Sequence, residues 1–386
     1  MNPLFSLVSD RSHVLQTAFY PIFEALYKGK PLETLFTTMN EQYHSQLKRG
    51  SANAYALTSL VDLESQVQPT IDLFMDKLAE LGENGKKPVD IATWALYFAF
   101  DGLGQINFSE DFGFLRSGSD VDNNIRTIDG LLAYLSIIGQ APWMHKLLLG
   151  NPLLQNILPL ESSNQVQQFA IRIIEKRLNG KQPNAGRDIL ARFLEVSEKE
   201  DAKLNLEQII ALTTVNLIAG SDSTALGIRA ILYYLCRNRD AYLKLQREID
   251  EAFESGTLAD PPQYAQASKL KYLDAVLVEG LRVHPATGFV LERTVPSGGA
   301  TISGKFIPEG TIVGINSWVM HANKSVYGKD AESFRPERWL EADEQQLRNM
   351  KRYNMTVRLP SISIILINRR KGDMPDFELI FINLLG

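Results

Sequence analysis

The feature that most constrains the fold of this chain is a long apolar helical pattern near its middle. The pattern begins at Asn205, where Asn205 and Gln208 have the spacing of a capping box, and it continues through Ile209 and Leu217 to about Cys236. At a rise of about 1.5 Å per residue, a helix of this length spans roughly 45 Å. The sequence therefore predicts a helix long enough to cross a whole domain.

Helical periodicity also covers most of the chain before Pro285. We predict further helices at 61–81 with a break near Pro69, 88–107, 121–138, 164–178 with Gly180 as a stop, 188–198, from a cap at Asp240 to near Gly256, and 270–283. Beyond Pro285, β-branched runs at 289–295, 300–303 and 311–315 are separated by turn residues and indicate short strands. The predicted fold is mainly α with a minor β lobe.

The composition is that of an ordinary globular protein, with 45% hydrophobic and 22% charged residues. A formal net charge of -5 disfavours a nucleic-acid-binding protein, because neutralising phosphates requires a basic face. A single cysteine excludes a disulfide within the chain and fits a reducing compartment. The N-terminus lacks a signal-peptide pattern, and the best candidate for a membrane span, 130–149, is interrupted by polar residues and a proline. We therefore expect no membrane span and a cytoplasmic chain.

A small and polar stretch, Ala-Gly-Ser-Asp-Ser-Thr at 219–224, interrupts the central helical pattern. Such residues oppose helix formation and are poorly placed in an apolar core. One interpretation is a kink or a solvent-facing stretch in which the hydroxyls bond the preceding turn. The other is a functional site, in which Asp222 exchanges protons with water while Ser223 or Thr224 holds an acceptor. The apolar flanks on both sides favour the functional interpretation.

Glu279 and Arg282 lie three residues apart in the predicted helix 270–283, so their side chains share one face. Arg338, in the run Phe-Arg-Pro-Glu-Arg-Trp at 334–339, offers a second guanidinium to the same carboxylate. For Glu-x-x-Arg alone, a weak exposed ion pair is the more common outcome. Together with the later run, the pair instead predicts a buried cluster of one carboxylate and two guanidinium groups.

Taken in order, these segments resemble the cytochrome P-450 family of haem-thiolate monooxygenases. The motifs that carry the resemblance are the stretch 219–224 in a long helix, Glu279 to Pro285, Arg293, His321 and the run 334–339. Residues 1–353 fit the family, and their general likeness is greatest to fungal enzymes similar to pisatin demethylase and benzoate para-hydroxylase. The resemblance implies one P-450-like domain. We expect this domain to lack the family's N-terminal anchor, first helix and first strands, so the predicted fold is incomplete.

The resemblance also implies a reaction. Members of the family bind haem b and insert one oxygen atom from dioxygen into a small apolar or aromatic metabolite, by hydroxylation or O-demethylation. The electrons come from NADPH-cytochrome P-450 reductase, at the endoplasmic reticulum membrane facing the cytosol. On this reading Asp222 and Ser223, with Thr224 beside them, take the acid and alcohol positions of the oxygen-activating helix, and Ala219 and Gly220 lie beside the dioxygen site.

Several other residues acquire expected roles from the resemblance. Arg293 matches a haem-propionate ligand, and a helix containing His44, Lys48 and Arg49 matches the one that contacts the other propionate, although a surface helix is almost as plausible an interpretation. The cluster of Glu279, Arg282 and Arg338 matches the brace of the haem-binding core. Substrate contacts are expected from residues 98–103, from the helix before Asp222 and from residues 286–291.

The family's cysteine ligand is missing from its expected place. After the run 334–339 the family has a glycine-rich loop whose cysteine thiolate ligates iron, whereas residues 354–386 contain no cysteine and no match to that loop. Cys236 is expected to be a small core residue, and His321 and Tyr353, although able to ligate iron, are expected to be structural. We therefore predict no metal ligand and doubtful haem binding.

The segment 354–386 is expected to form a separate tail that replaces the haem-binding loop. Its apolar runs at 361–368 and 377–385 flank a charged turn and could pair as a hairpin. We expect it to arise from an altered reading of the gene, such as a retained intron or a frameshift.

Two functions follow from these observations. The first is a haem monooxygenase by descent, inactive in this chain because the ligand loop is absent. The alternative is a non-catalytic remnant that binds small apolar ligands or regulates a full-length relative.

Overall fold

The computed structural model describes residues 15–28, 30–83, 85–148, 162–181, 186–199 and 204–356. The helices of the first half are α2 Glu41–Ser51, α3 Leu57–Val61, α4 Glu64–Leu81, α5 Ile91–Phe108, α6 Phe114–Ser117, α7 Asn124–Ile138, α8 Trp143–Leu147, α10 Ser162–Leu178 and α11 Ile189–Ser197. Those of the second half are α12 Leu206–Arg237, α13 Arg239–Glu254, α14 Tyr264–Ala267, α15 Lys271–Val283, α16 Ser317–His321, α17 Lys324–Tyr327, α18 Arg338–Glu341 and α19 Glu344–Tyr353. The 3-10 helices are η1 Tyr20–Phe23 and η2 Val121–Asn123.

The strands of the described ranges are short and form three small sheets. They are β1 Leu15–Gln16, β2 Ala25–Tyr27, β3 Lys30–Leu32, β4 Arg293–Thr294, β5 Ala300–Ile302, β6 Lys305–Ile307 and β7 Ile312–Val313. The order β1-β4-β7 is antiparallel throughout, with Leu15 opposite Thr294 and Arg293 opposite Val313. The other two sheets are the hairpins β2-β3 and β5-β6. The mainly α fold with a minor β lobe is confirmed.

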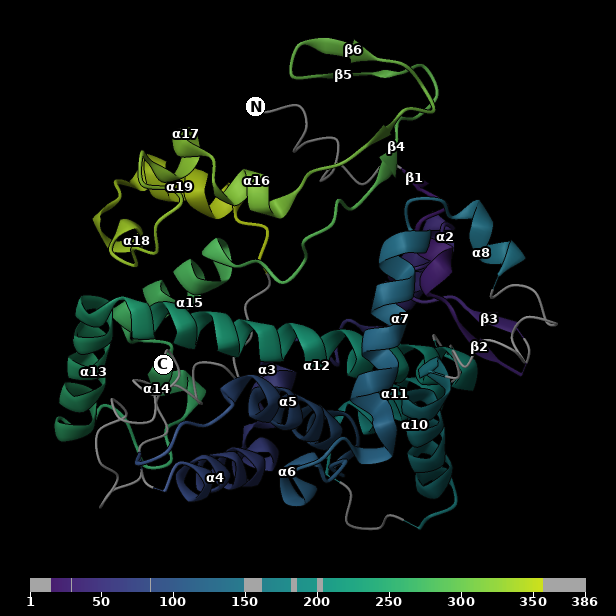
Figure 1. Ribbon diagram of the computed structural model, residues 1–386. Helices are drawn as coiled ribbons and strands as arrows, with labels where there is room; N and C mark the ends of the chain where they lie inside the picture. The colour runs from purple at the N-terminus through teal and green to yellow at the C-terminus, as the bar shows by residue number, and fades with distance from the viewer. Residues whose placement is uncertain are drawn as a thin grey trace.

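Helix α12 crosses the molecule, with α4, α5 and α6 on one side and α15 on the other (Figure 1). Its start has the predicted capping box, since the Asn205 side chain accepts from the Gln208 N–H and the Gln208 side chain accepts from the Asn205 N–H. It is also long and apolar enough to cross a membrane, but 56% of its apolar window is buried in the protein. Because its neighbours cover it, α12 serves as the central helix of the core.

The structure departs from the predicted elements where tertiary packing outweighs local signals. Helix α4 runs through Pro69 without a break, because burial of its apolar face outweighs one lost backbone hydrogen bond near its start. The residue before α13 is Asn238, so Asp240 lies in the first turn instead of capping the helix. The expected strand 289–295 shortens to Arg293–Thr294, and the early hairpin β2-β3 was not predicted.

Candidate functional site

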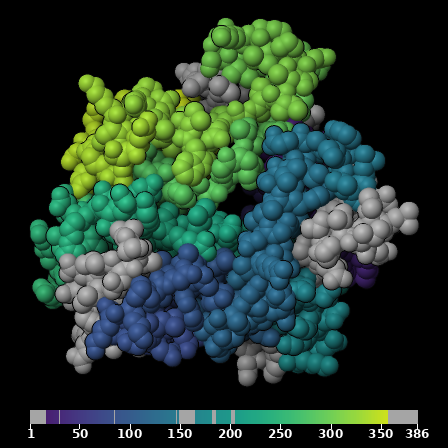
Figure 2. Space-filling model, viewed as in Figure 1, coloured from purple at the N-terminus to yellow at the C-terminus, as the bar shows by residue number. Residues whose placement is uncertain are grey.

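A hollow lies between α7 and the segment that follows α15, on the side of α12 away from α5 (Figures 1 and 2). The middle of α12 borders it with an open face: Ala219 is exposed and Asp222 and Ser223 are half-buried, whereas Leu217 and Ser221 are fully buried. Residues three and four apart share one side of a helix, so Ala219, Asp222 and Ser223 lie together. The open face of the central helix is therefore made of small and polar side chains.

The polar stretch of α12 is helical without a kink. The hydroxyls of Ser221 and Ser223 each donate to the carbonyl four residues earlier, Leu217 and Ala219, at 2.7 Å. These bonds satisfy the hydroxyls inside a regular helix, in agreement with the interpretation of back-bonding. Thr224, in contrast, is buried and lies away from the open face.

Asp222 is the carboxyl of this face. Burial raises the pKa of the Asp222 carboxyl above its ordinary value, with Asp129 of α7 adding to the shift and Arg229 opposing it. Within the described ranges, no hydrogen bond or ion pair ties the Asp222 carboxyl to another residue. A carboxyl with a raised pKa and no fixed partner is chemically able to exchange protons at a cavity wall.

Gly220 points to the opposite side. A Cβ added there would lie 2.9 Å from Leu103 Cδ1, so the glycine allows α12 to approach α5 closely. The packing of α5 against α12 also places residues 98–103, which were expected to contact substrate. Residues 98–102 are buried in α5, on the far side of α12 from the hollow, and Leu103 is half-buried. The contact of this segment with substrate therefore stays a prediction.

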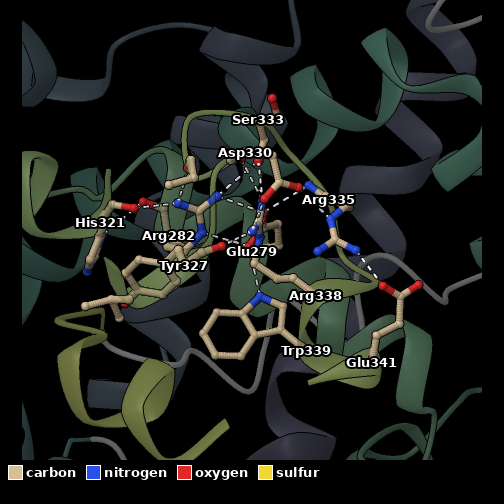
Figure 3. A network of polar contacts seen from close by, with 12 residues as sticks. Glu279, Arg282, His321, Tyr327, Asp330, Ser333, Arg335, Arg338, Trp339 and Glu341 are labelled. Atoms are coloured by element: carbon tan, nitrogen blue, oxygen red, sulfur yellow. Dashed lines mark hydrogen bonds and ion pairs between the residues drawn. The ribbon is translucent and has the colours of Figure 1, made fainter. Parts of the chain in front are cut away.

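Glu279, Arg282 and Arg338 form one buried cluster (Figure 3). Arg282 donates to both carboxylate oxygens of Glu279 at 2.8 Å, and the Arg338 Nε donates to Glu279 Oε1 at 2.9 Å. Burial alone would raise the pKa of Glu279, but the hydrogen bonds and charges of the two guanidinium groups hold it below its usual range. All three side chains are at most 3% exposed. Asp330, which accepts from Arg338 at 3.0 Å, supplies the second negative charge that balances the two guanidinium groups.

The cluster extends further than the sequence motif indicated. The indole of Trp339 and the backbone N–H of Arg335 both donate to Glu279 at 2.9 Å. Arg282 also donates to the carbonyls of His321 and Ala331 at 2.6 Å. The cluster thus joins α15, α16, α18 and the loop before α18. Trp339 was the residue within the run 334–339 that could have been added to the predicted cluster.

His321 lies at the edge of this cluster with both ring nitrogens engaged. Its Nδ1 donates to the Arg282 carbonyl at 2.9 Å, and its Nε2 accepts from the Met355 N–H at 2.9 Å. Burial lowers the pKa of His321 to about 4, so the ring is neutral near pH 7. A ring held in this way has no nitrogen left for iron, which agrees with the structural role expected for it.

The residues expected near haem propionates lie on two separate elements. Arg293, in β4, donates to the hydroxyl of Tyr20 and to the Glu292 carbonyl, and its guanidinium lies 5.2 Å from the centre of the Tyr20 ring. His44, Lys48 and Arg49 lie in α2, where His44 is half-buried and both cations are exposed. Tyr20, which orients Arg293, carries no signal in the sequence that would have identified it.

These residues fit part of a haem group but not its iron. Arg293, Lys48 and Arg49 offer cations for carboxylates, and exposed Ala219 leaves room for a flat group beside α12. Haem iron takes a single axial side chain from the protein, a cysteine thiolate in haem-thiolate enzymes. The chain's only cysteine, Cys236, lies in the last turn of α12, away from Ala219.

Cys236, in the last turn of α12, is half-buried, and burial raises the pKa of its thiol to about 11. The thiol form therefore dominates at neutral pH, whereas iron binds a thiolate. Tyr353 ends α19 and is half-buried. The tail from residue 357 onward, with its expected hairpin, lies outside the described residues.

Comparison with known proteins identifies the family of this fold. Residues 13–355 match the family model described as cytochrome P-450. The chain is 36% identical over 349 residues to a cytochrome P-450 monooxygenase of Aspergillus terreus, covering 89% of this chain and 70% of that protein. It is 34% identical over 319 residues to pisatin demethylase of Fusarium vanettenii, covering 80% and 60% respectively. The chain therefore belongs to the cytochrome P-450 family of haem-dependent monooxygenases.

Proposed function

We propose that this chain binds a small neutral apolar or aromatic molecule, as a haem monooxygenase binds its substrate. We further propose that it does not carry out thiolate-dependent oxygenation. The observation that carries the proposal is the position of its only cysteine. Cys236 lies roughly 25 Å along α12 from Ala219, at about 1.5 Å per residue, and its thiol is protonated at neutral pH. It is too far from the hollow to ligate an iron beside Ala219.

The complete reaction of the family would need haem b, which supplies dioxygen activation when it is bound, and electrons from NADPH-cytochrome P-450 reductase. Hydroxylation or O-demethylation is the reaction that we assign to active relatives, and the name of pisatin demethylase supports the second. Residues 1–353 form the P-450-like domain in this proposal, and residues 354–386 form a tail in place of the ligand loop. Members of the family are often associated with membranes.

This chain's own residues would act at the walls of the hollow. Asp222 would hold and exchange a proton at its carboxyl, and Ser223, whose hydroxyl is bonded to the Ala219 carbonyl, would accept a hydrogen bond from a bound molecule. Arg293 of β4, with Lys48 of α2, would hold carboxylates at the edge of the site. His44 and Arg49 lie on α2 with Lys48, and Gly220 and Thr224 lie on α12 with Asp222 and Ser223. We propose that Gly220 and Thr224 contribute through packing.

The test is the carbon monoxide difference spectrum of the purified, haemin-treated and reduced chain. Thiolate ligation gives a band at about 450 nm, and we expect none. Appearance of that band would overturn the proposal.

A further inference from the structure

Arg293 of β4 is a half-buried cation without a carboxylate partner among the described residues. Its neighbour Glu292 does not pair with it, because the Glu292 carboxylate accepts instead from the Thr17 hydroxyl at 2.8 Å. A guanidinium keeps its charge at every ordinary pH, and a partly buried charge is normally paired. The Arg293 side chain is therefore a candidate receptor for a carboxylate that comes from outside the chain.

One edge of the Arg293 guanidinium is held and the other is free. Its Nη1 donates both to the Tyr20 hydroxyl and to the Glu292 carbonyl, the latter at 2.7 Å. The Nε and Nη2 atoms make no hydrogen bond to any residue in the described ranges. These two nitrogens form one edge of the planar fork, which matches the two oxygens of a carboxylate.

The Tyr20 side chain is the fixed part of this arrangement. The pairing of β1 with β4 sets Gln16 opposite Arg293, and the chain then turns into η1, which begins at Tyr20. The Tyr20 ring is 1% exposed and lies edge-on to the rings of Phe19 and Phe36, at centroid distances of 5.5 and 5.2 Å. Its orientation is therefore set by packing before any ligand binds.

The Tyr20 hydroxyl bonds Arg293 without neutralising it. The hydroxyl donates to the Glu292 carbonyl at 3.1 Å and accepts from Arg293, whose guanidinium carbon lies 5.2 Å from the centre of the Tyr20 ring. Burial raises the pKa of the Tyr20 hydroxyl above its ordinary value, although the Arg293 charge opposes the shift. The phenol is therefore neutral at pH 7 and leaves the positive charge of Arg293 available.

We propose that Tyr20 is a positioning residue that holds the Arg293 guanidinium with its free edge ready to bind a carboxylate of a planar ligand. The inference rests on the proposed function, in which Arg293 holds a carboxylate at the edge of the site. A long arginine side chain that is already fixed loses less entropy on binding than one that rotates freely. The hydroxyl of Tyr20 should contribute about as much as one net hydrogen bond, or about 2- to 12-fold in affinity.

The test uses metal-free protoporphyrin IX, a planar molecule with carboxylates, and its dimethyl ester, which has the same ring without the charges. Quenching of tryptophan fluorescence gives both dissociation constants for the full chain and for Tyr20→Phe, which loses only the hydroxyl. We expect the dissociation constant of the ester divided by that of the acid to fall about 2- to 12-fold in Tyr20→Phe. The matched control is Tyr233→Phe. Tyr233 also has a guanidinium near its ring, that of Arg237 at 5.8 Å, but it lies at the exposed end of α12, so the ratio should not change.

The outcomes separate this inference from the proposed function. A role of Tyr20 in packing alone would weaken both compounds equally, so an unchanged ratio in Tyr20→Phe overturns the positioning role while carboxylate binding stands. If the wild type binds the acid no better than the ester, carboxylate binding by Arg293 fails, and this inference fails with it. Should Tyr20→Phe not fold, as judged by circular dichroism, Tyr20→Met replaces it with the same expected fall, because it also fills the core without a hydroxyl.

Discussion

At the scale of single residues, the Glu279 carboxylate lies at the centre of a buried group of charged side chains. It is 0% exposed and receives hydrogen bonds from Arg282, Arg338, Trp339 and the Arg335 backbone. Removing one member of such a group leaves an uncompensated buried charge, which costs more than the group itself contributes to stability. The fold therefore depends on the completeness of this cluster.

Glu279→Gln is expected to lower the free energy of unfolding by about 3 to 5 kcal/mol, because buried Arg282 loses its counter-charge and buried Arg338 keeps only its ion pair with Asp330. Urea denaturation measures the loss. The matched control is Arg335→Gln. Its guanidinium is 40% exposed and pairs with Asp330 and Glu341, so the change should cost less than about 1 kcal/mol, and its backbone bond to Glu279 remains. Equal losses in the two variants would contradict a buried brace.

His321 predicts a pH dependence of stability. Its folded pKa is lowered to about 4 by burial, whereas the unfolded ring titrates near about 6.5. Between these values the unfolded chain binds a proton that the folded chain does not, so the free energy of unfolding falls as the pH falls from about 6.5 to about 4, by about 3 kcal/mol in all. Denaturation at several pH values measures this slope, and His321→Gln should flatten it. His145 and His284 also have lowered pKa values. Because both residues are present in the wild type and in His321→Gln, they do not account for a difference in slope between the two. An unchanged slope in the variant would refute the assignment.

At the scale of elements, the central helix α12 is held by close contacts at two glycines. Gly280 brings α15 against Ile231 of α12, and Gly220 brings α12 against Leu103 of α5. The two contacts differ in what they touch. A Cβ at position 280 would lie 2.5 Å from Ile231 Cγ1 and 3.4 Å from its Cα, whereas a Cβ at 220 meets the tip of Leu103. The α12–α15 contact therefore tolerates an added methyl group less well than the α12–α5 contact does.

Gly280→Ala is expected to lower the free energy of unfolding by about 1 to 2 kcal/mol, because overpacking against Ile231 exceeds the gain in helix propensity. Gly220→Ala should change it by less than about 1 kcal/mol, since the end of the Leu103 side chain is able to move. Thermal unfolding of both variants tests the difference. A larger loss at Gly220 would show that α5, and not α15, sets the position of α12.

The long elements could be predicted from sequence because their signals are local. The capping box at Asn205 and the apolar period placed α12 within a residue of its observed ends. The hairpin β2-β3 is local but was missed, because strands of three residues each are too short to show an alternating pattern. The side towards which Gly220 points could not be predicted, because it depends on packing between distant segments. Likewise, the sequence motif brought Glu279, Arg282 and Arg338 together, but Tyr20 reaches Arg293 across more than half of the chain. Tertiary contacts of that kind leave no local pattern.

At the scale of the whole molecule, the buried cluster around Glu279 and the hollow beside α12 are both present, and we propose that no described residue ligates iron. Glu279 and its partners tie α15 to the loops around it, and the open face of α12 borders the hollow. The single cysteine lies at the far end of α12. We therefore propose that this chain binds a small neutral ligand without activating dioxygen, two properties that members of the family normally combine.

The carbon monoxide difference spectrum of the reduced, haemin-treated chain shows whether a thiolate ligates iron in this protein. It should be recorded with Cys236→Ala beside the wild type, and with the Aspergillus terreus relative as a positive control for the measurement. We expect a band at about 450 nm for the relative and none for either form of this chain. A band in the wild-type chain that disappears in Cys236→Ala would show that Cys236 ligates iron and would refute the proposed absence of thiolate ligation.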